Sequence, residues 1–354
     1  MLNWKDRSHP LAGGAEEYTQ QIAARLVDLG HDVTLFVAAV EGQPEREVVE
    51  GYNVIRRGSR LRVYAEAKKF WATEGEGNFD VVIDECNTRP FLTPRYVTSV
   101  PVVALIHQVA REVWRFETPL PMALAGRYLF EPRWLREYRD IPVMTISESS
   151  AESLRAYGVQ HLIVLPIGAD EVEQPDVAKS MEPTIVFLGR LSQNKRPDDA
   201  LEAFARLRSS VPNARLWMMG DGPMRDRLER SLSDGAEILG HVPWEERQRR
   251  LAEANVLVAT SVREGWGLNV SEAAAVGTPT IGYRVDGLRD SIAASGGLLI
   301  DPNPGSLACA LEKFFEGGHD LDPRISTVPW AEVGDAVAAV LSDTVGRLPL
   351  PRGR

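Results

Sequence analysis

Two acidic residues flank a glycine turn in the second half of the chain. Glu264 precedes the turn Gly265-Trp-Gly267, and Glu272 follows it by five residues. Because glycines interrupt helix formation, Glu264 is predicted in a loop and Glu272 about one turn into the next helix. The amides near Leu268 to Val270 are then free donors for an anion. Acids that merely complement the helix dipole, worth about 0.3–1 kcal/mol each, explain either carboxylate but not the glycines.

Two cations follow an apolar stretch about seventy residues upstream. Thr184–Leu188 is a predicted strand, and Gly189-Arg190 and Lys195 come directly after it. Arg190 offers a planar fork for two phosphate oxygens, and Lys195 adds a compact positive charge. Open α/β sheets bind ligands beyond the carboxyl ends of their strands. A phosphate-binding loop is therefore predicted here, with two solvated loop cations as the alternative.

The first half of the chain contains two more candidates. Gly13-Gly14 precedes the first predicted helix, where glycines let backbone amides approach a phosphate. A simple helix-entry turn explains this pair equally well. His107 follows the predicted strand Val102–Ile106, where it could donate a hydrogen bond to a sugar hydroxyl or a phosphate oxygen. A structural role is the alternative for this histidine.

Strands and helices alternate along the chain, which predicts an α/β fold with doubly wound parallel sheets. Gly14–Leu29 is an amphipathic helix, and helices are also predicted at Pro197–Ser210, Met224–Ser233 and Trp330–Leu341. The remaining predicted strands are Val33–Val37, Val81–Ile83, Val143–Ile146, Leu162–Leu165, Ala214–Met219, Val256–Ala259 and Thr280–Ile281. Only Met1 to Trp4 precede the first loop. Either the first strand is a frayed edge, or translation starts upstream.

The length of 354 residues favours two domains. We assign residues 1–166 to an N-terminal domain, the polar and acidic residues 167–183 to a linker, and residues 184–325 to a C-terminal domain. Residues 326–354 form a terminal helix, which can cross back to the first domain, and a tail.

Composition excludes several classes of protein. Apolar residues make up 44%, enough for a core, and the formal charge of −10 argues against nucleic-acid binding. The sequence has no run of about 18 apolar residues, so no membrane span is predicted. No signal peptide is recognisable either, so a cytoplasmic protein is expected. Cys86 and Cys309 are too distant for a disulfide framework or a zinc site. We expect two buried free thiols.

Residues 111–139 alternate arginines with aromatic residues. Such a segment could touch a membrane surface or line an acceptor groove. Because four glutamates interrupt the positive charge, a surface helix pair is favoured, with at most weak membrane association.

Five motifs together resemble those of the retaining GT-B glycosyltransferases of family 4, the group 1 glycosyltransferases. They appear in the family's order, from the first residues to about Pro302. The motifs are Gly13-Gly14-Ala-Glu16, Gly30-His-Asp-Val-Thr34, Gly189-Arg190 with Lys195, Gly220-Asp-Gly222, and Glu264-Gly-Trp-Gly-Leu with Glu272.

The resemblance implies two Rossmann-like domains facing a central cleft, with the acceptor on the N-terminal side and the nucleotide sugar on the C-terminal side. It also implies hexosyl transfer from a nucleoside diphosphate sugar with retention, without metal or cofactor. The implied catalytic residues are Glu264, His107, Arg190 and Lys195. The implied donor-binding residues are Gly13, Gly14, Arg190, Lys195, His241, Val242, Gly267, Leu268, Asn269 and Glu272. In that family, the matching residues imply that Glu264 would bind the donor sugar, Glu272 the ribose and the segment around His241 the base.

Two departures from the family pattern concern single residues. Ile167 stands where a family turn usually carries Asn, and Ser271 replaces an apolar residue, which predicts a packing change. A nicotinamide dehydrogenase is rejected because Gly220-Asp-Gly222-Pro-Met-Arg225 lacks the third glycine of its phosphate fingerprint. A nucleotide-sugar epimerase and a non-catalytic sugar-nucleotide-binding protein stay open. A small soluble acceptor, such as an oligosaccharide or an antibiotic precursor, is favoured, and the donor's base and sugar are unassigned.

Overall fold

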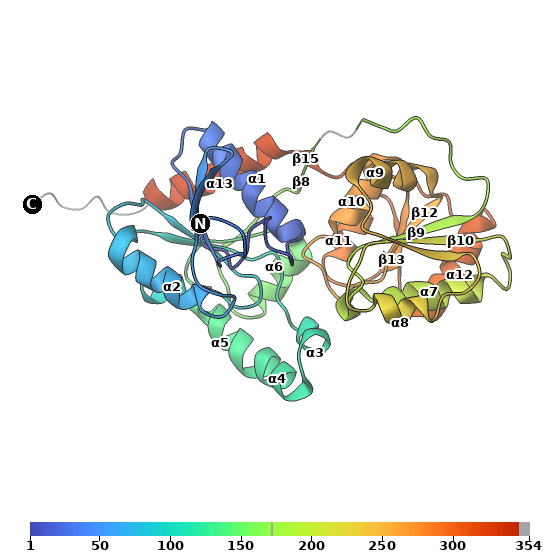
Figure 1. The fold of residues 1–354 in the computed structure, drawn as a ribbon, viewed down its shortest axis with the longest axis horizontal. Coiled ribbons are helices and arrows are strands. Elements are labelled where there is room, and N and C mark those ends of the chain that lie inside the picture. Colours follow the sequence, from blue (N-terminus) through green and yellow to red (C-terminus); the bar gives the residue numbers. More distant parts are fainter. Residues whose placement is uncertain (171–172, 347–354) are drawn as a thin grey trace, which may run out of the picture. The chain divides into compact units, whose positions relative to one another are not determined.

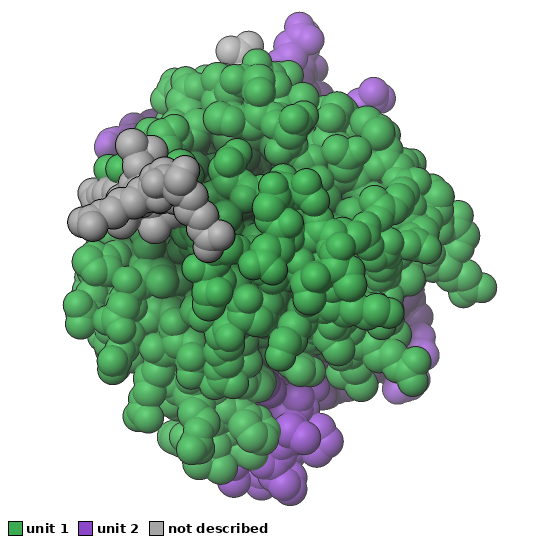
Figure 2. All heavy atoms as spheres, turned by 90° about the vertical axis from the view of Figure 1, so that its left-hand side faces the viewer, with its two compact units in different colours: residues 1–110, 125–170, 327–354 green, residues 111–124, 171–326 purple. Residues whose placement is uncertain are grey.

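The computed structural model describes residues 1–170 and 173–346, which divide into two α/β units (Figures 1 and 2). Unit 1 comprises residues 1–110, 125–170 and those from 327 onward, and unit 2 comprises residues 111–124 and 171–326. Residues 111–124, assigned above to the N-terminal domain, therefore group with unit 2.

Unit 2 contains a six-stranded parallel sheet in the order β11-β10-β9-β12-β13-β14. Its strands are β9 (Thr184–Leu188), β10 (Arg215–Met219), β11 (Ala236–Gly240), β12 (Val256–Ala259), β13 (Thr280–Tyr283) and β14 (Leu298–Ile300). The order reverses between β9 and β12. The carboxyl ends of these two strands therefore form the switch point at which such sheets bind ligands.

Helices cover both faces of this sheet (Figure 1). One face carries α7 (Pro197–Leu207), α8 (Arg225–Glu229) and α12 (Pro304–Phe315), and the other carries α9 (Trp244–Glu253), α10 (Leu268–Ala275) and α11 (Leu288–Ala294). The sequence patterns did not predict α9, α11, α12, β11 or β14. In α9 the reason is composition, because its only buried residues are Gln248, Leu251 and Ala252.

Unit 1 is built on one sheet whose centre is the amino-terminal segment. Leu2 bridges in parallel to Phe36 and to Asp84. Its amide donates to the Ile83 carbonyl (2.8 Å), and its carbonyl accepts from the Glu85 amide (2.9 Å). These bonds join the three-stranded group β1-β3-β2 to the four-stranded group β4-β5-β6-β7. The expectation of a frayed edge is therefore wrong.

The strands of this sheet are β1 (Thr34–Val37), β2 (Arg46–Val49), β3 (Tyr52–Arg56), β4 (Val82–Glu85), β5 (Val102–Leu105), β6 (Val143–Thr145) and β7 (Leu162–Val164). All its strand pairs are parallel except β2 with β3. The helices of unit 1 are α1 (Gly14–Asp28), α2 (Val63–Phe70), η1 (Trp71–Gly75), η2 (Thr93–Arg95), η3 (Gly126–Phe130), α5 (Glu131–Leu135), η4 (Arg136–Tyr138), α6 (Glu148–Arg155) and α13 (Trp330–Gly346).

The carboxyl-terminal helix α13 lies beside α1 (Figure 1). Two short strands, β8 (Gly168–Ala169) and β15 (Val328–Pro329), pair in parallel just before it. Trp330 packs edge-on against Tyr18, with ring centroids 5.5 Å apart. These contacts make residues 328–346 part of the packed structure of unit 1.

One other expectation needs correction. Cys86 is buried, but Cys309 on α12 is exposed, so the thiols are not both in the core. Residues 111–139 form two helical stretches, as expected. The first is α3 (Val113–Glu117), and the second runs without a break from α4 (Leu120–Ala125) through η3 and α5 to Tyr138. Pro119 lies between the two, because proline cannot continue a helix from within. Within residues 1–170 and 173–346, no helix has the length and apolar character needed to cross a bilayer.

Candidate functional site

A salt bridge at the switch point of unit 2 joins Lys195 to Glu264. Lys195 ends the short helix η5 (Gln193–Lys195) after β9, and Glu264 lies in the loop between β12 and α10. The Lys195 ammonium contacts Glu264 Oε1, and the Ser261 hydroxyl donates to the same oxygen (2.6 Å). The Lys195 and Glu264 side chains are 29% and 14% exposed. The structure thus brings a predicted cation and a predicted acid into direct contact, where an incoming ligand can reach both.

A buried arginine holds the loop that carries Glu264. Arg263 donates to Asp286 (2.5 Å) and to Glu112 (3.0 Å), and the Glu264 amide donates to the Asp286 carbonyl (3.0 Å). Arg263 belongs to none of the motifs that predicted the site. Its partners lie 23 and 151 residues away, so only the tertiary fold identifies the role.

The start of α10 lies against the end of β9. Gly267 has φ +102°, which favours glycine, and a Cβ there would lie 2.8 Å from a Leu288 methyl group. The Asn269 side chain donates to the Leu188 carbonyl (2.9 Å). The Val270 amide already donates to the Gly267 carbonyl (2.9 Å), so the expectation that it is free is wrong. Among the described residues, the Leu268 and Asn269 amides have no acceptor, which leaves two donors for an anion.

The substitution at Ser271 has a different consequence from the packing change predicted. The indole nitrogen of Trp266 donates to the Ser271 hydroxyl (2.9 Å). This bond ties the glycine turn to the helix that follows it.

Arg190 is exposed in the loop after β9 and forms no ion pair or side-chain hydrogen bond with the described residues. The loop itself is held by close backbone packing. A Cβ at Gly220 would lie 2.0 Å from the Gly189 carbonyl oxygen, and the Leu191 amide donates to the Asp221 carbonyl (2.9 Å). The Gly220-Asp-Gly222 motif therefore supports the Arg190 loop, and the Arg190 guanidinium remains available to a ligand.

Glu272 of α10 forms a second polar pair, with Arg247 of the neighbouring helix α9. Its Oε2 is 3.5 Å from Arg247 Nε, and the Arg247 guanidinium lies over the Trp244 ring at 4.5 Å from the centroid. Burial raises the pKa of Glu272, and Arg247 opposes that shift. His241, exposed, and Val242, partly buried, follow β11 just before this helix. Arg247 and Trp244 were missed because α9 was not predicted.

In unit 1 the glycine turn is held by Glu16, two residues after Gly14, in an arrangement that we call the clamp. The Gly13 amide donates to Glu16 Oε2 (2.7 Å), and the Lys5 ammonium lies 3.0 Å from the same oxygen. One of the amides expected to meet a phosphate is therefore already bonded, while Gly14 begins α1. Burial raises the pKa of Glu16, and Lys5 opposes that shift.

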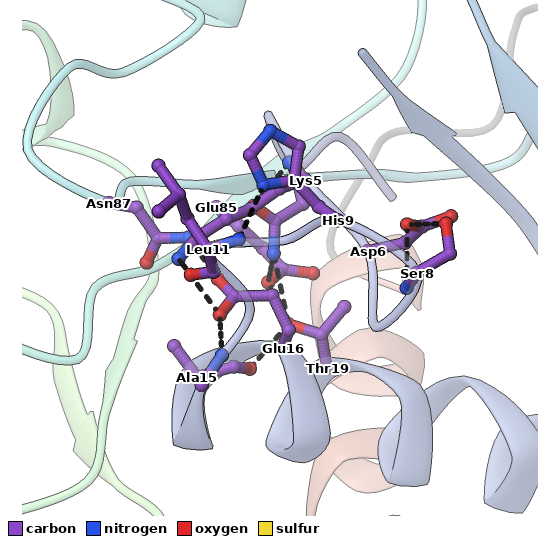
Figure 3. Close-up of polar contacts among 12 residues, drawn as sticks. Lys5, Asp6, Ser8, His9, Leu11, Ala15, Glu16, Thr19, Glu85 and Asn87 are labelled. Carbon is purple, nitrogen blue, oxygen red and sulfur yellow. Dashed lines mark hydrogen bonds and ion pairs between the residues drawn. The ribbon is translucent and has the colours of Figure 1, made fainter. Parts of the chain in front are cut away.

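The clamp belongs to a buried polar network, drawn in Figure 3. Asn87 donates to Glu16 Oε1 (3.2 Å) and to Asn3 Oδ1 (2.9 Å). Asn3 and Thr19 both donate to Glu85 Oε2, the former at 3.1 Å. Burial raises the pKa of Glu85 to about 8. The hydrogen bonds from Thr19 and Asn3 and the charge of the amino terminus oppose this rise in the pKa of Glu85.

His107 lies at the carboxyl end of β5, with 6% of its surface exposed. Its ring meets Tyr18 edge-on, with centroids 5.4 Å apart. Neither ring nitrogen has a hydrogen-bond partner among the described residues, and burial lowers the pKa of the imidazole to about 4. An unsatisfied buried polar group costs about 1–3 kcal/mol, so this neutral histidine is suited to a ligand's polar group.

No group of three or more His, Cys, Asp or Glu side chains in the described parts of the chain is arranged to hold a metal ion. Unit 2 thus carries two cations, two free amides and two carboxylates among the predicted site residues, and unit 1 by itself carries one buried imidazole.

Comparisons with known proteins cover almost the whole chain. The family model "Glycosyltransferase Family 4" matches residues 12–173, and "Glycosyl transferases group 1" matches residues 169–326. Glycogen synthase of Mycobacterium tuberculosis is 24% identical over 333 residues, covering 82% of this chain and 79% of the relative.

Solved structures show the same fold at low sequence identity. Sucrose-phosphate synthase from Thermosynechococcus elongatus gives a TM-score of 0.72 at 18% identity, covering 97% of this chain and 94% of that one. HepE of Anabaena, in complex with UDP and glucose, gives 0.69 at 16% identity, covering 97% and 98%. The chain is therefore a GT-B protein with two Rossmann-like domains, and it belongs to the group 1, family 4 glycosyltransferases.

Proposed function

We propose that this glycosyltransferase moves a sugar from a nucleoside diphosphate sugar to an acceptor hydroxyl, with retention of configuration and without a metal ion. The observation that carries the proposal is the contact between Lys195 and Glu264, next to the free amides of Leu268 and Asn269. A cation for phosphate and a carboxylate for sugar hydroxyls lie side by side there. The structural likeness to HepE, solved with UDP and glucose, supports this type of donor.

The chemistry follows from where charge develops. When the anomeric C–O bond breaks, the diphosphate gains negative charge and the sugar becomes oxocarbenium-like. Arg190, Lys195 and the two amides would stabilise the leaving group, each charged hydrogen bond contributing about 1.5–3 kcal/mol. Lys195 would turn from Glu264 to the phosphate, and Glu264 would then accept hydrogen bonds from the donor sugar.

The remaining residues would bind the rest of the donor. Glu272 would accept from the ribose hydroxyls, and the segment around His241 and Val242 would border the base. His107, neutral at physiological pH, would donate to a hydroxyl of the transferred sugar. Gly13 and Gly14 would line the diphosphate with the amides that Glu16 leaves free.

Retention is assigned to a front-side reaction. The acceptor hydroxyl would arrive on the face from which the phosphate departs, and that phosphate would take the hydroxyl proton. The leaving group then serves as the base, so the reaction needs no separate protein base at the anomeric centre.

The acceptor class is the least constrained part of the proposal. A small soluble acceptor, such as an oligosaccharide or an antibiotic precursor, agrees with a net charge of −10, which disfavours anionic surfaces. The epimerase and the non-catalytic binding protein are not favoured by the family assignment.

A two-stage assay tests the proposal. A thermal-shift panel of UDP, GDP, ADP and dTDP sugars identifies the donor, because a ligand that binds only the folded state raises the melting temperature. The donor is then incubated alone and with acceptors, with and without EDTA, and the product's anomeric configuration is read by NMR. Retained configuration and an EDTA-insensitive rate are expected. Isomerisation of the donor alone, an inverted product or strict metal dependence would contradict the proposal.

A further inference from the structure

Arg247 lies between an aromatic ring of its own helix, α9, and a carboxylate of α10. Its guanidinium carbon lies 4.5 Å from the centroid of Trp244, and its Nε lies 3.5 Å from Glu272 Oε2. The two charged side chains are 27% and 25% exposed, yet these two facing atoms are buried. Neither atom forms a hydrogen bond with any described residue. The pair is thus close enough to attract but not bonded, and Glu272 keeps its capacity to accept.

The neighbouring arginines of α9 are arranged differently. Arg249 donates to Glu246 (2.8 Å) and to Glu253 (3.2 Å), and Arg250 donates to Glu246 (2.7 Å). These are pairs within one helix, at spacings typical of helix surfaces, where each contributes little. Arg247 instead reaches a carboxylate on another helix, α10.

Opposing influences act on the Glu272 carboxyl. Burial favours its neutral form, and the positive charge of Arg247 favours the ionised form. A carboxylate binds a diol best when it is charged and fixed in direction, because hydrogen bonds to a charged acceptor are shorter and stronger. Arg247 can supply both conditions only while its own guanidinium is held, and the Trp244 ring holds it.

We propose that Arg247 is a positioning residue for the donor: supported by Trp244, it orients the Glu272 carboxylate to accept hydrogen bonds from the ribose hydroxyls. This inference rests on the proposed function and adds a residue pair on α9 to it. It predicts that Arg247 acts through the ribose, and that removing both ribose hydroxyls removes the contribution of Arg247.

The test compares ribonucleotides with their 2′,3′-dideoxy counterparts, which lack both hydroxyls. UDP, GDP and ADP, each with its dideoxy form, are titrated calorimetrically into wild type, Arg247→Met, Arg247→Lys and Trp244→Leu. Arg249→Met is the matched control, because it removes the same charge from the same helix at a site bonded to Glu246 and Glu253. We expect Arg247→Met to weaken binding of the ribonucleotide about tenfold or more and binding of the dideoxynucleotide less than twofold. Arg247→Lys and Trp244→Leu should show the same selectivity with a smaller loss.

Kinetics give an independent reading. With the donor identified by the panel, Arg247→Met should raise KM for the donor about tenfold while kcat changes less than threefold, and Arg249→Met should match wild type. In a Glu272→Gln background, Arg247→Met should cause no further loss.

Equal weakening of ribo- and dideoxynucleotide binding by Arg247→Met, or no weakening of either, would overturn the inference. Circular dichroism reports whether Arg247→Met folds. If it misfolds, Trp244→Leu provides the same test of the inference, because it removes the ring that supports Arg247. If wild type bound no nucleotide at all, both the proposed function and this inference would fall. Normal binding by wild type with unselective loss in the variant would overturn the inference alone.

Discussion

Glu264→Gln is the perturbation that separates sugar binding from phosphate binding. Glutamine keeps the shape of the side chain and can still accept from the Ser261 hydroxyl, which lies 2.6 Å from Glu264 Oε1. It removes the negative charge that pairs with Lys195. The variant therefore changes one charge at the switch point and leaves the loop's other anchors, Arg263 and Asp286, in place.

The expected effect on folding is small. The pair is partly exposed, and exposed ion pairs contribute about 0.2–1 kcal/mol. The effect on transfer is larger, because each hydrogen bond from a sugar hydroxyl to a carboxylate contributes about 1.5–3 kcal/mol. Loss of two such bonds would lower kcat/KM by roughly 10²–10⁴-fold.

Binding of the free nucleoside diphosphate should move the other way. With no carboxylate to hold it, Lys195 is free to meet the phosphate, so the affinity of Glu264→Gln for the nucleotide without sugar should equal or exceed that of wild type. Initial rates with the identified donor, calorimetric titration with the nucleoside diphosphate, and thermal unfolding measure the three quantities. Glu202→Gln is the control, because it breaks a surface ion pair with Arg206 in the same unit.

Two results would refute this reasoning. Undiminished kcat/KM in Glu264→Gln would remove the carboxylate from the reaction. A loss of affinity for the free diphosphate as large as the loss for the nucleotide sugar would show that Glu264 does not act on the sugar.

Three further predictions concern the framework around the site. Gly220→Ala places a Cβ 2.0 Å from the Gly189 carbonyl oxygen, so it should lower the free energy of unfolding by about 1–3 kcal/mol and weaken nucleotide binding. Chemical denaturation and calorimetry measure these two effects. A variant with unchanged stability and binding would show that the loops of Gly189 and Gly220 do not pack closely. Burial raises the pKa of Glu85 from 4.5 to about 8 in the fold, so its burial costs no stability below pH 4.5 and progressively more as pH rises through 8, in total on the order of 4–5 kcal/mol. Glu85→Gln should therefore gain stability relative to wild type between pH 5 and pH 9, as measured by urea titrations. A stability difference independent of pH would contradict the raised pKa. Burial lowers the pKa of His107 from 6.5 to about 4, so the free energy of unfolding falls by on the order of 3 kcal/mol as pH drops from 6.5 towards 4. His107→Asn should make the free energy of unfolding less dependent on pH in this range, measured by the same titrations. An unaltered pH profile would show that the imidazole is not held neutral.

Local patterns predicted the elements whose apolar residues form continuous runs. β9 was predicted with its observed bounds, Thr184–Leu188, and α1 to within one residue, because a buried parallel strand and an amphipathic helix each leave a periodic signature. Helix α9 is mostly charged and buries only Gln248, Leu251 and Ala252, so few apolar residues mark it in the sequence. The segment Met1 to Trp4 is too short to show a period, and only hydrogen bonds from both neighbours define it as a strand.

Motif order and strand patterns identify the family, the strand ends that carry Lys195 and Glu264, and the types of charge that meet there, because parallel strands deliver their loops to one edge of a sheet. Three-dimensional packing sets which of those groups already have partners. It buries Arg263 between Asp286 and Glu112, 23 and 151 residues away along the chain, and it places Arg247 of α9 beside Glu272 of α10. The bond from the Gly13 amide to Glu16 is local, but contacts between distant segments depend on how whole elements pack, which no local pattern encodes.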